Sequence, residues 1–272
     1  MIDINEAPFY DKRKSPLCRS PIQGKMAAAK VRVITCGKER DDSMTLNEMI
    51  YHRKSCRSFA GRPVDAEMIE KILSFEMKPL HPQIRVRMDI VSRDKVKCIC
   101  PWTTPQLIAI YSEETDGYLE NIGFLFQQMD LYLQTLGLGV CWLGMGRMNP
   151  KTTTEVAGMK FVILLAFGYP KGDQLRYGRK GFKRKPMEQI TDKPDLRLEA
   201  ARLAPSAVNS QPWYFTHEGD AIHVYCSKKG SQLDAGIAMA HLYVENPESF
   251  RFFRAEDVTQ IPGYGYLGSV AL

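Results

Sequence analysis

The sequence lacks a hydrophobic run long enough to span a bilayer. Its longest apolar stretch, Phe161–Phe167, falls far short of the roughly 20 residues that a transmembrane helix needs. It also lacks an even set of cysteines: there are seven, and no signal-peptide pattern precedes them. We therefore expect no membrane partner, free thiols rather than a disulfide framework, and a cytoplasmic location.

Metal-ligand patterns are scarce as well. Cys98 and Cys100 form an isolated Cys-x-Cys with no second ligand pair nearby. Because a structural zinc site needs about four ligands, we predict no metal site. Half of the net charge of +6 falls in residues 1–43, where nine Lys/Arg face six Asp/Glu. The remaining excess is modest and does not by itself indicate nucleic-acid binding.

Residues 1–43 show little periodicity, and we expect a poorly ordered leader. Clear signals begin at Thr45, where Thr-Leu-Asn-Glu is a capping box. Further helices are expected from Asp65 and at Leu119–Leu136, Asp195–Leu203 and Asp234–Val244; strands are expected at Arg85–Val91, Gln106–Tyr111, Lys160–Tyr169, Tyr214–Phe215 and Ile222–Cys226. This order favours an α+β fold around one sheet, and its elements repeat loosely in the two halves of the chain.

A cationic segment is predicted to end the first helix. Arg53, Ser55 and Arg57 combine guanidinium groups with a hydroxyl, and a guanidinium can bind phosphate through two parallel hydrogen bonds. The alternative is a solvated helix C-terminus, where cations interact favourably with the helix dipole.

Two loops could approach a flat ligand. Residues Ala204–Trp213 form a Pro-bounded loop of small hydroxyl and amide residues, which can turn several polar groups toward one ligand; Trp213 itself suits the core. Residues Gly137–Gly146 form a glycine-rich turn, and glycine lets a backbone approach a ring closely. The turn does not have the spacing of a dinucleotide-binding fingerprint.

The basic cluster Lys171–Lys185 follows a Gly-Tyr-Pro strand end. A nucleic-acid patch is one interpretation, but no stacking aromatics alternate with the cations as they do in single-strand binders. We favour one or two of these cations binding a phosphate, with the others solvated.

Together these motifs resemble the FMN-dependent nitroreductase superfamily. The resemblance rests on Arg-x-Ser-x-Arg-x-Phe, Ala-Pro-Ser-x-x-Asn-Ser-Gln-Pro-Trp, Gly-Leu-Gly-x-Cys-Trp-Leu-Gly and Gly-Tyr-Pro, spread over roughly residues 44–225. It implies a nitroreductase-like α+β fold with a mixed sheet flanked by helices.

The order of the motifs departs from that of ordinary members, in which the Ala-Pro-Ser loop follows soon after the arginine motif. Here it lies in the second half of the chain. This resembles a branch in which two fused half-modules form a pseudo-dimer with an internal two-fold duplication, so that a monomer is competent. The expected division is a leader at 1–43, a first half at 44–170, a basic connecting segment at 171–194 and a second half at 195–272.

The resemblance also implies roles for residues of this chain. Arg53 would bind the FMN phosphate with Arg184 and Lys183, Ser55 would contact the ribityl or pyrimidine region, and Arg57 would face the ring edge where negative charge accumulates on reduction. Pro205, Ser206 and Asn209 would close the site from the second half, and backbone amides near Met145 and Gly146 would reach the ring. Lys54 lies within the binding motif without a role of its own.

The function implied is an FMN-dependent oxidoreductase. It would transfer hydride from NADH or NADPH through FMN to a nitroaromatic, quinone or similar electron-poor acceptor, with no catalytic acid or base from the protein. The alternatives are a flavin-binding sensor or sequestering protein without useful turnover and a nucleic-acid-associated protein; we expect no nucleic-acid partner.

Overall fold

The computed structural model describes residues 2–3, 44–100, 102, 104–152, 155–173, 175–177 and 181–272. The leader predicted at 1–43 therefore lies outside the described residues, apart from a short strand β1 (Ile2–Asp3). No helix of the described residues is both long and apolar enough to cross a membrane.

Two sheets form the outer layers of the molecule. The first has the strand order β1-β2-β4-β8-β5, with β7 paired to β8; the second has the order β11-β12-β10-β9. The strands are β2 (Val86–Ser92), β4 (Gln106–Ser112), β5 (Gly139–Leu143), β7 (Glu155–Val156), β8 (Met159–Gly168), β9 (Trp213–Glu218), β10 (Ala221–Ser227), β11 (Arg251–Phe253) and β12 (Tyr264–Ala271). A separate two-stranded sheet pairs β3 (Val96–Lys97) with β6 (Arg147–Met148).

These strand pairs are antiparallel, and isolated parallel bridges extend the two large sheets. Ser55 bridges to Val140 of β5, and Thr191 bridges to Phe215 of β9. The expected α+β fold with mixed pairing is therefore confirmed. It is built on two sheets rather than one, because the second half forms its own hairpin β9-β10 and adds β12 and β11, which the sequence did not suggest.

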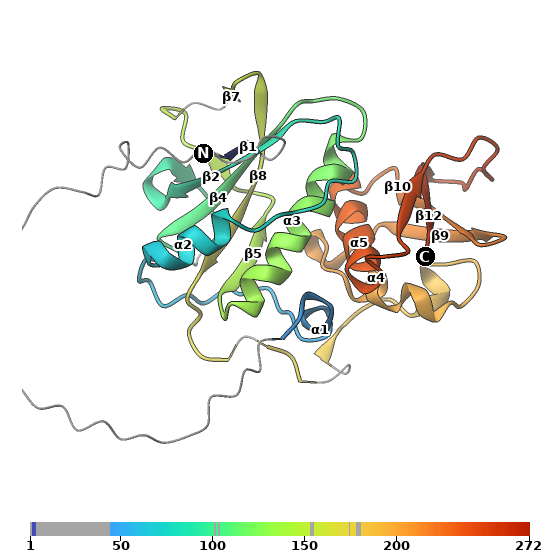
Figure 1. Cartoon of the computed structure of the whole chain (residues 1–272), viewed down its shortest axis with the longest axis horizontal. Coiled ribbons are helices and arrows are strands. Elements are labelled where there is room, and N and C mark those ends of the chain that lie inside the picture. The colour runs from blue at the N-terminus through green and yellow to red at the C-terminus, as the bar shows by residue number, and fades with distance from the viewer. Residues whose placement is uncertain are drawn as a thin grey trace, which may run out of the picture.

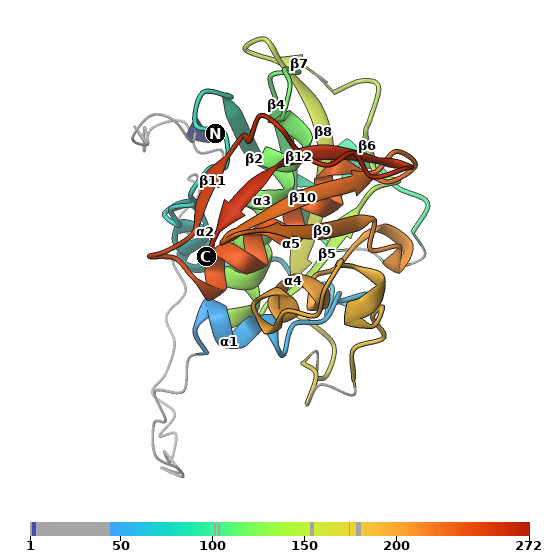
Figure 2. The same cartoon turned by 90° about the vertical axis from the view of Figure 1, so that its right-hand side faces the viewer.

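Two long helices lie between the sheets (Figure 1). Helix α3 (Tyr118–Thr135) packs on β4 and β5, and α5 (Gln232–Glu245) packs on β9 and β10. Figure 2, turned toward the four-stranded sheet, shows that sheet lying over α5. Both helices are buried around most of their circumference, as expected of helices enclosed between two layers.

The crossing of α3 and α5 is reciprocal. A Cβ atom on Gly123 would lie 2.0 Å from the carbonyl oxygen of Leu233, and a Cβ on Gly236 would lie 2.1 Å from that of Glu120. Each glycine therefore faces the backbone of the other helix, three residues before the other glycine. Only glycine permits this approach, because any side chain would overlap the opposite carbonyl.

Two short helices begin where the sequence predicts. Helix α1 (Leu46–Ile50) has the predicted capping box of Thr45 and Glu48; α2 (Ala66–Leu73) follows Asp65, whose side chain caps it. The helix expected at Asp195–Leu203 is a 3-10 turn (Leu196–Leu198) followed by α4 (Glu199–Leu203). Helix α1 ends at Ile50, so the prediction that the segment Arg53–Phe59 ends a helix is wrong.

Candidate functional site

A cavity of about 600 Å³ collects residues from three distant parts of the chain. Its lining side chains are Lys54, Ser55, Arg57, Leu175, Arg176, Gly181, Lys183, Arg184, Pro205, Ser206, Val208 and Asn209. Eight of the eleven predicted site residues are among them; Arg53, Met145 and Gly146 are not. The structure thus brings together the arginine motif, the basic segment and the Ala-Pro-Ser loop.

The arginine motif lies in an extended segment beside the edge of the first sheet. The Cys56 N–H donates to the Val140 carbonyl at 2.7 Å, and Ser55 forms the parallel bridge to the same strand. Because side chains alternate along an extended segment, Ser55 and Arg57 lie on one side, toward the cavity, and Cys56 lies on the other, fully buried.

Arg53 is buried beneath this segment, with only 1% of the residue exposed. Its Nε donates to Asp130 Oδ1 at 3.3 Å, and its Nη2 donates to Ser55 Oγ at 3.3 Å. Gln134 connects Asp130 to the arginine motif: its side-chain amide donates to the same Asp130 oxygen, and its Oε1 accepts a hydrogen bond from the Lys54 N–H at 3.0 Å. Arg53 therefore adds positive charge behind the cavity while its carboxylate partner holds its side chain in place. Its predicted contact with a phosphate stays a prediction.

The basic segment supplies the most crowded cations. Arg176 donates from Nε to the Gly181 carbonyl at 3.0 Å and from Nη1 to the Arg53 carbonyl, and it stacks 4.4 Å above the Phe182 ring. Arg184 donates from Nε to the Leu203 carbonyl at 3.2 Å and from Nη1 to Asn209 Oδ1 at 2.5 Å. These neutral acceptors orient both guanidinium groups without cancelling their charge.

Positive charge therefore accumulates at the cavity. Burial, followed by the charges of Arg53 and Arg57, lowers the pKa of Arg176 to about 10; burial, followed by the charges of Arg53, Arg176 and Arg202, lowers the pKa of Arg184 to about 10. Within the described part of the chain, no carboxylate lies within ion-pair distance of Arg57, Arg176 or Arg184. A bound anion would relieve this repulsion.

The Ala-Pro-Ser loop closes the cavity in a strained conformation. Val208, Asn209 and Gln211 all have positive φ angles, of 47°, 59° and 46°, a region that β-branched residues such as Val rarely adopt. Hydrogen bonds fix the loop to the basic segment: Asn209 Nδ2 donates to the Lys183 carbonyl at 2.8 Å, and the Lys185 N–H donates to Gln211 Oε1 at 2.8 Å. Backbone strain that neighbouring contacts hold in place is common at ligand sites.

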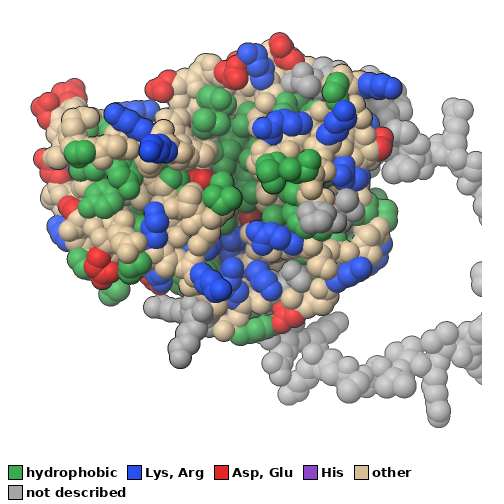
Figure 3. Space-filling view, turned by 180° about the vertical axis from the view of Figure 1, so that it is seen from behind, with side chains coloured by type: hydrophobic (Ala, Val, Ile, Leu, Met, Phe, Trp, Pro, Cys, Tyr) green, Lys and Arg blue, Asp and Glu red, His purple; other side chains and the backbone are tan. Residues whose placement is uncertain are grey.

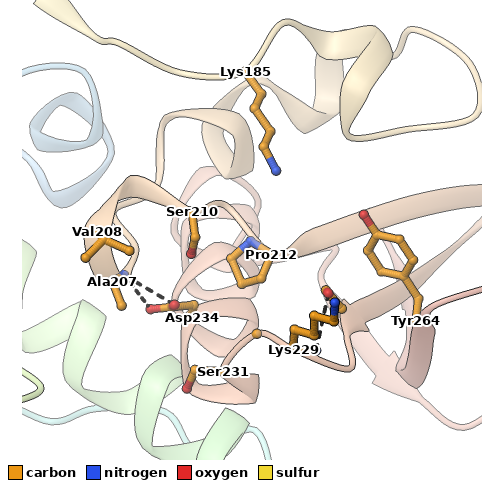
Figure 4. Close-up of a pocket in the computed structure, with 11 residues that line it drawn as sticks. Lys185, Ala207, Val208, Ser210, Pro212, Lys229, Ser231, Asp234 and Tyr264 are labelled. Atoms are coloured by element: carbon orange, nitrogen blue, oxygen red, sulfur yellow. Dashed lines mark hydrogen bonds between the residues drawn. The ribbon is translucent and has the colours of Figure 1, made fainter.

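A second anchor lies behind the loop, beside another cavity of about 440 Å³ (Figure 4). The Asp234 carboxylate of α5 accepts hydrogen bonds from the Ala207 N–H at 3.1 and 3.2 Å, and Figure 4 shows both bonds. Burial raises the pKa of Asp234 to about 6, opposed by these bonds. Asn121 of α3 has a corresponding role, because its Oδ1 accepts from the N–H groups of Leu80 and His81 at 2.9 Å.

Met145 and Gly146 lie in the turn after β5. Met145 is 63% exposed, and the Gly146 N–H donates to the Leu143 carbonyl at 3.0 Å, so this amide already has a partner within the turn.

Figure 3 shows a hollow between the two parts of the molecule, with hydrophobic side chains inside it and Lys and Arg side chains gathered along its lower border.

The sequence analysis did not single out Arg176, Leu175, Gly181 or Val208 as site residues, although they line the cavity. Arg176 belongs to the basic cluster from which one or two phosphate-binding cations were expected. The signal was present, but the spacing alone could not say which cation turns inward. Within the described residues, no group of three or more potential metal ligands occurs.

Comparison with known proteins identifies the family. Residues 45–246 match the family described as "Putative TM nitroreductase", which is most of the chain. The protein therefore belongs to this nitroreductase family, and the family indicates an oxidoreductase. No curated protein matches the sequence.

A solved structure agrees on the fold. A structure described as a "putative nitroreductase" from Thermotoga maritima MSB8 is 21% identical, with a TM-score of 0.60; the alignment covers 89% of this chain and 97% of that chain. A nitroreductase family protein from Clostridium difficile 630 is 19% identical over 56% of this chain and 100% of that chain, with a TM-score of 0.44. An FMN-dependent nitroreductase from Clostridium difficile R20291 is 17% identical over 48% and 91%, with a TM-score of 0.38.

Proposed function

We propose that the protein is an FMN-dependent oxidoreductase that uses NADH or NADPH to reduce a small electron-poor acceptor such as a nitroaromatic or a quinone. The observation that carries this proposal is the cavity whose guanidinium groups have no carboxylate partner among the described residues. A dianionic phosphate monoester next to several cations matches this donor set, since guanidinium groups bind phosphate through two parallel hydrogen bonds.

The residues of this chain would divide the cofactor between two surfaces. Arg176, Arg184 and Lys183 would bind the phosphate, with Arg53 adding charge from beneath. Ser55 and Asn209 would bind the hydroxyl-rich linker, with Pro205 and Ser206 closing the cavity from the second half. The flat ring would then extend into the hydrophobic hollow beside the cations (Figure 3). The turn that holds Met145 and Gly146 would reach the ring, as the family resemblance implies.

FMN, when bound, supplies the hydride-transfer chemistry between the nicotinamide and the acceptor. The protein orients the partners and shapes the electrostatic environment. Arg57 would place a positive charge near the part of the ring that gains electron density, which favours the reduced form. We propose no side chain as a catalytic acid or base.

We also propose that one chain builds a complete site, as two fused halves, 44–170 and 195–272, joined by the segment 171–194. The reciprocal glycine crossing of α3 and α5 supports this arrangement, as do the matching roles of Asn121 and Asp234. The expected stoichiometry is one FMN per chain in a monomer, which sedimentation analysis of the flavin-loaded protein measures. A flavin that binds only to a dimer would contradict it.

An absorption spectrum tests the main proposal. The protein is measured as purified, again after FMN addition and desalting, and then with NADH or NADPH under nitrogen. Retained oxidised-flavin bands that bleach with either nicotinamide support an oxidoreductase. Retained bands that neither nicotinamide bleaches would favour a flavin-binding protein without turnover. A protein that retains no FMN would refute the proposal altogether.

A further inference from the structure

Two of the cysteines differ from the others in their access to solvent. Five cysteines are described, and Cys56, Cys141 and Cys226 are buried, with exposed fractions of 0%, 5% and 3%. Burial raises the pKa of Cys141 and Cys226 to about 12, so these thiols have little tendency to ionise. Cys98 and Cys100 are partly exposed and stand only one residue apart.

The side chain of Cys98 lies against both the backbone and the thiol of Cys100. Strand β3 ends at Lys97, and the N–H of Cys100 donates to Cys98 Sγ at 3.5 Å. Arg93 holds the segment from the other side, since its guanidinium donates to the Val96 carbonyl at 2.6 Å and to the Cys98 carbonyl at 3.5 Å. The Cys98 sulfur therefore has a backbone donor, and Arg93 fixes the backbone of the same segment.

The two thiols have unequal chemistry. Burial raises the pKa of Cys100, and interaction with the Cys98 thiol raises it further. Cys98, whose sulfur already accepts a backbone hydrogen bond, is therefore the candidate attacking thiol, and Cys100 is the candidate resolving thiol. One residue separates the two cysteines, so their Cα atoms are no more than about 7 Å apart, close to the Cα separation of about 4.4–6.8 Å that a disulfide requires.

We propose that Cys98 and Cys100 are a redox-active dithiol that forms a reversible disulfide by exchange with small-molecule disulfides. The Cys98 thiolate attacks one sulfur of the small disulfide, forming a mixed disulfide and releasing one thiolate. Cys100 then loses its proton and attacks the Cys98 sulfur, releasing the second thiolate. The protons of the two cysteines end on the two released thiols, so the protein dithiol is oxidised and the small disulfide is reduced.

The pair stands beside the candidate site but does not depend on it. Arg57 is close enough for its charge to act on Cys100, and the Trp102 ring lies 5.8 Å from that of Phe59, two residues after Arg57. A metal at this place would need further ligands, because two thiolates supply only half of a structural zinc site. The proposal therefore concerns exchange between thiols and needs neither FMN nor a metal.

The test uses the folded full-length chain in buffers of increasing oxidised-to-reduced glutathione ratio. Cys18 and Cys36 are replaced by Ser to remove competing thiols, free thiols are alkylated, and the protein is analysed by mass spectrometry. Cleavage after Trp102 separates the pair from Cys141. We expect the peptide that carries Cys98 and Cys100 to lose both alkylation sites and two hydrogen atoms as the ratio rises. The buried Cys56, Cys141 and Cys226 serve as internal controls that stay reduced.

Two variants assign the roles. Cys100→Ser should trap one glutathionyl group on Cys98, and Cys98→Ser should be modified much more slowly. Two free thiols at every glutathione ratio would overturn the proposal. So would a glutathionyl group on Cys98 that persists when Cys100 is present. Trapping on Cys100 but not on Cys98 would overturn the assignment of Cys98 as the attacking thiol. The mapping of the chain with both cysteines decides the disulfide even if a variant fails to fold.

Discussion

Arg184 offers a sharp test of where the proposed phosphate binds. Its guanidinium is oriented by the Leu203 carbonyl and by Asn209 Oδ1, and no carboxylate in the described part of the chain pairs with it. Replacing Arg184 by Ala removes the charge without leaving a buried carboxylate unpaired. We therefore expect the effect to fall on FMN affinity more than on the fold.

The magnitude follows from the bond that is lost. A hydrogen bond to a charged group contributes about 1.5–3 kcal/mol. The dissociation constant for FMN should therefore rise roughly 10- to 150-fold in Arg184→Ala. Arg184→Lys should fall in between, because lysine keeps the charge but cannot make the two parallel bonds of a guanidinium.

The measurement is a fluorescence titration of FMN with wild type and variants at fixed ionic strength, together with thermal unfolding. Lys193→Ala is the matched control, since it removes an exposed cation that does not line the cavity. Unchanged FMN affinity in Arg184→Ala, or an equal loss in Lys193→Ala, would refute the assignment of the phosphate to this end of the cavity.

Three further predictions concern the framework around the site. Asp234→Asn should raise the free energy of unfolding by on the order of 1–3 kcal/mol at pH 7. Because the folded-state pKa of Asp234 is raised to about 6, its contribution to stability is fully present below about pH 4 and is lost as the pH rises through 6. Denaturant unfolding at several pH values should show that the variant lacks this loss, and an unchanged pH profile would contradict the prediction. Gly123→Ala should destabilise the protein by about 1–3 kcal/mol or more, because the new Cβ would overlap the Leu233 carbonyl. Gly265→Ala is the control and should not destabilise it, since a Cβ there would meet nothing closer than 4.0 Å. Equal melting temperatures of the two variants would argue against the close crossing. Arg53→Ala should lower the free energy of unfolding by about 3–5 kcal/mol, because it leaves the buried Asp130 carboxylate without its cation. Denaturant unfolding measures this loss, and a variant as stable as wild type would contradict the buried ion pair.

Local signals predicted much of the fold. The cap at Thr45, the helix that begins after Asp65 and the long helix α3 follow from short-range chemistry, and the structure confirms them. The glycine-rich turn predicted at Gly137–Gly146 is wrong for Gly139–Leu143, because these residues pair with β8 and form strand β5. Strand β12 was missed because it lies between β10 and β11 in the sheet, and β10, with which it forms its longer pairing, is far from it in the sequence.

The site shows the same division between local and distant information. The sequence pointed to the motifs that contribute lining residues, such as Ser55 and Asn209. It could not show that Arg53 would be buried against Asp130, because that carboxylate lies in α3, far from Arg53 in the sequence. Nor could it choose Arg176 from its basic neighbours, since the choice depends on the carbonyls of Gly181 and Arg53.

The reciprocal crossing of Gly123 and Gly236 also bears on how the two halves can change. In an assembly of two identical subunits, every substitution appears twice, once in each copy. In the proposed fusion of two halves, each half has its own codons, so Asn121 and Asp234 can hold their loops with different chemistry. The crossing is the exception, because a side chain on either glycine would overlap the other helix. The two halves are thus free to specialise in their loops while one shared contact still restricts both.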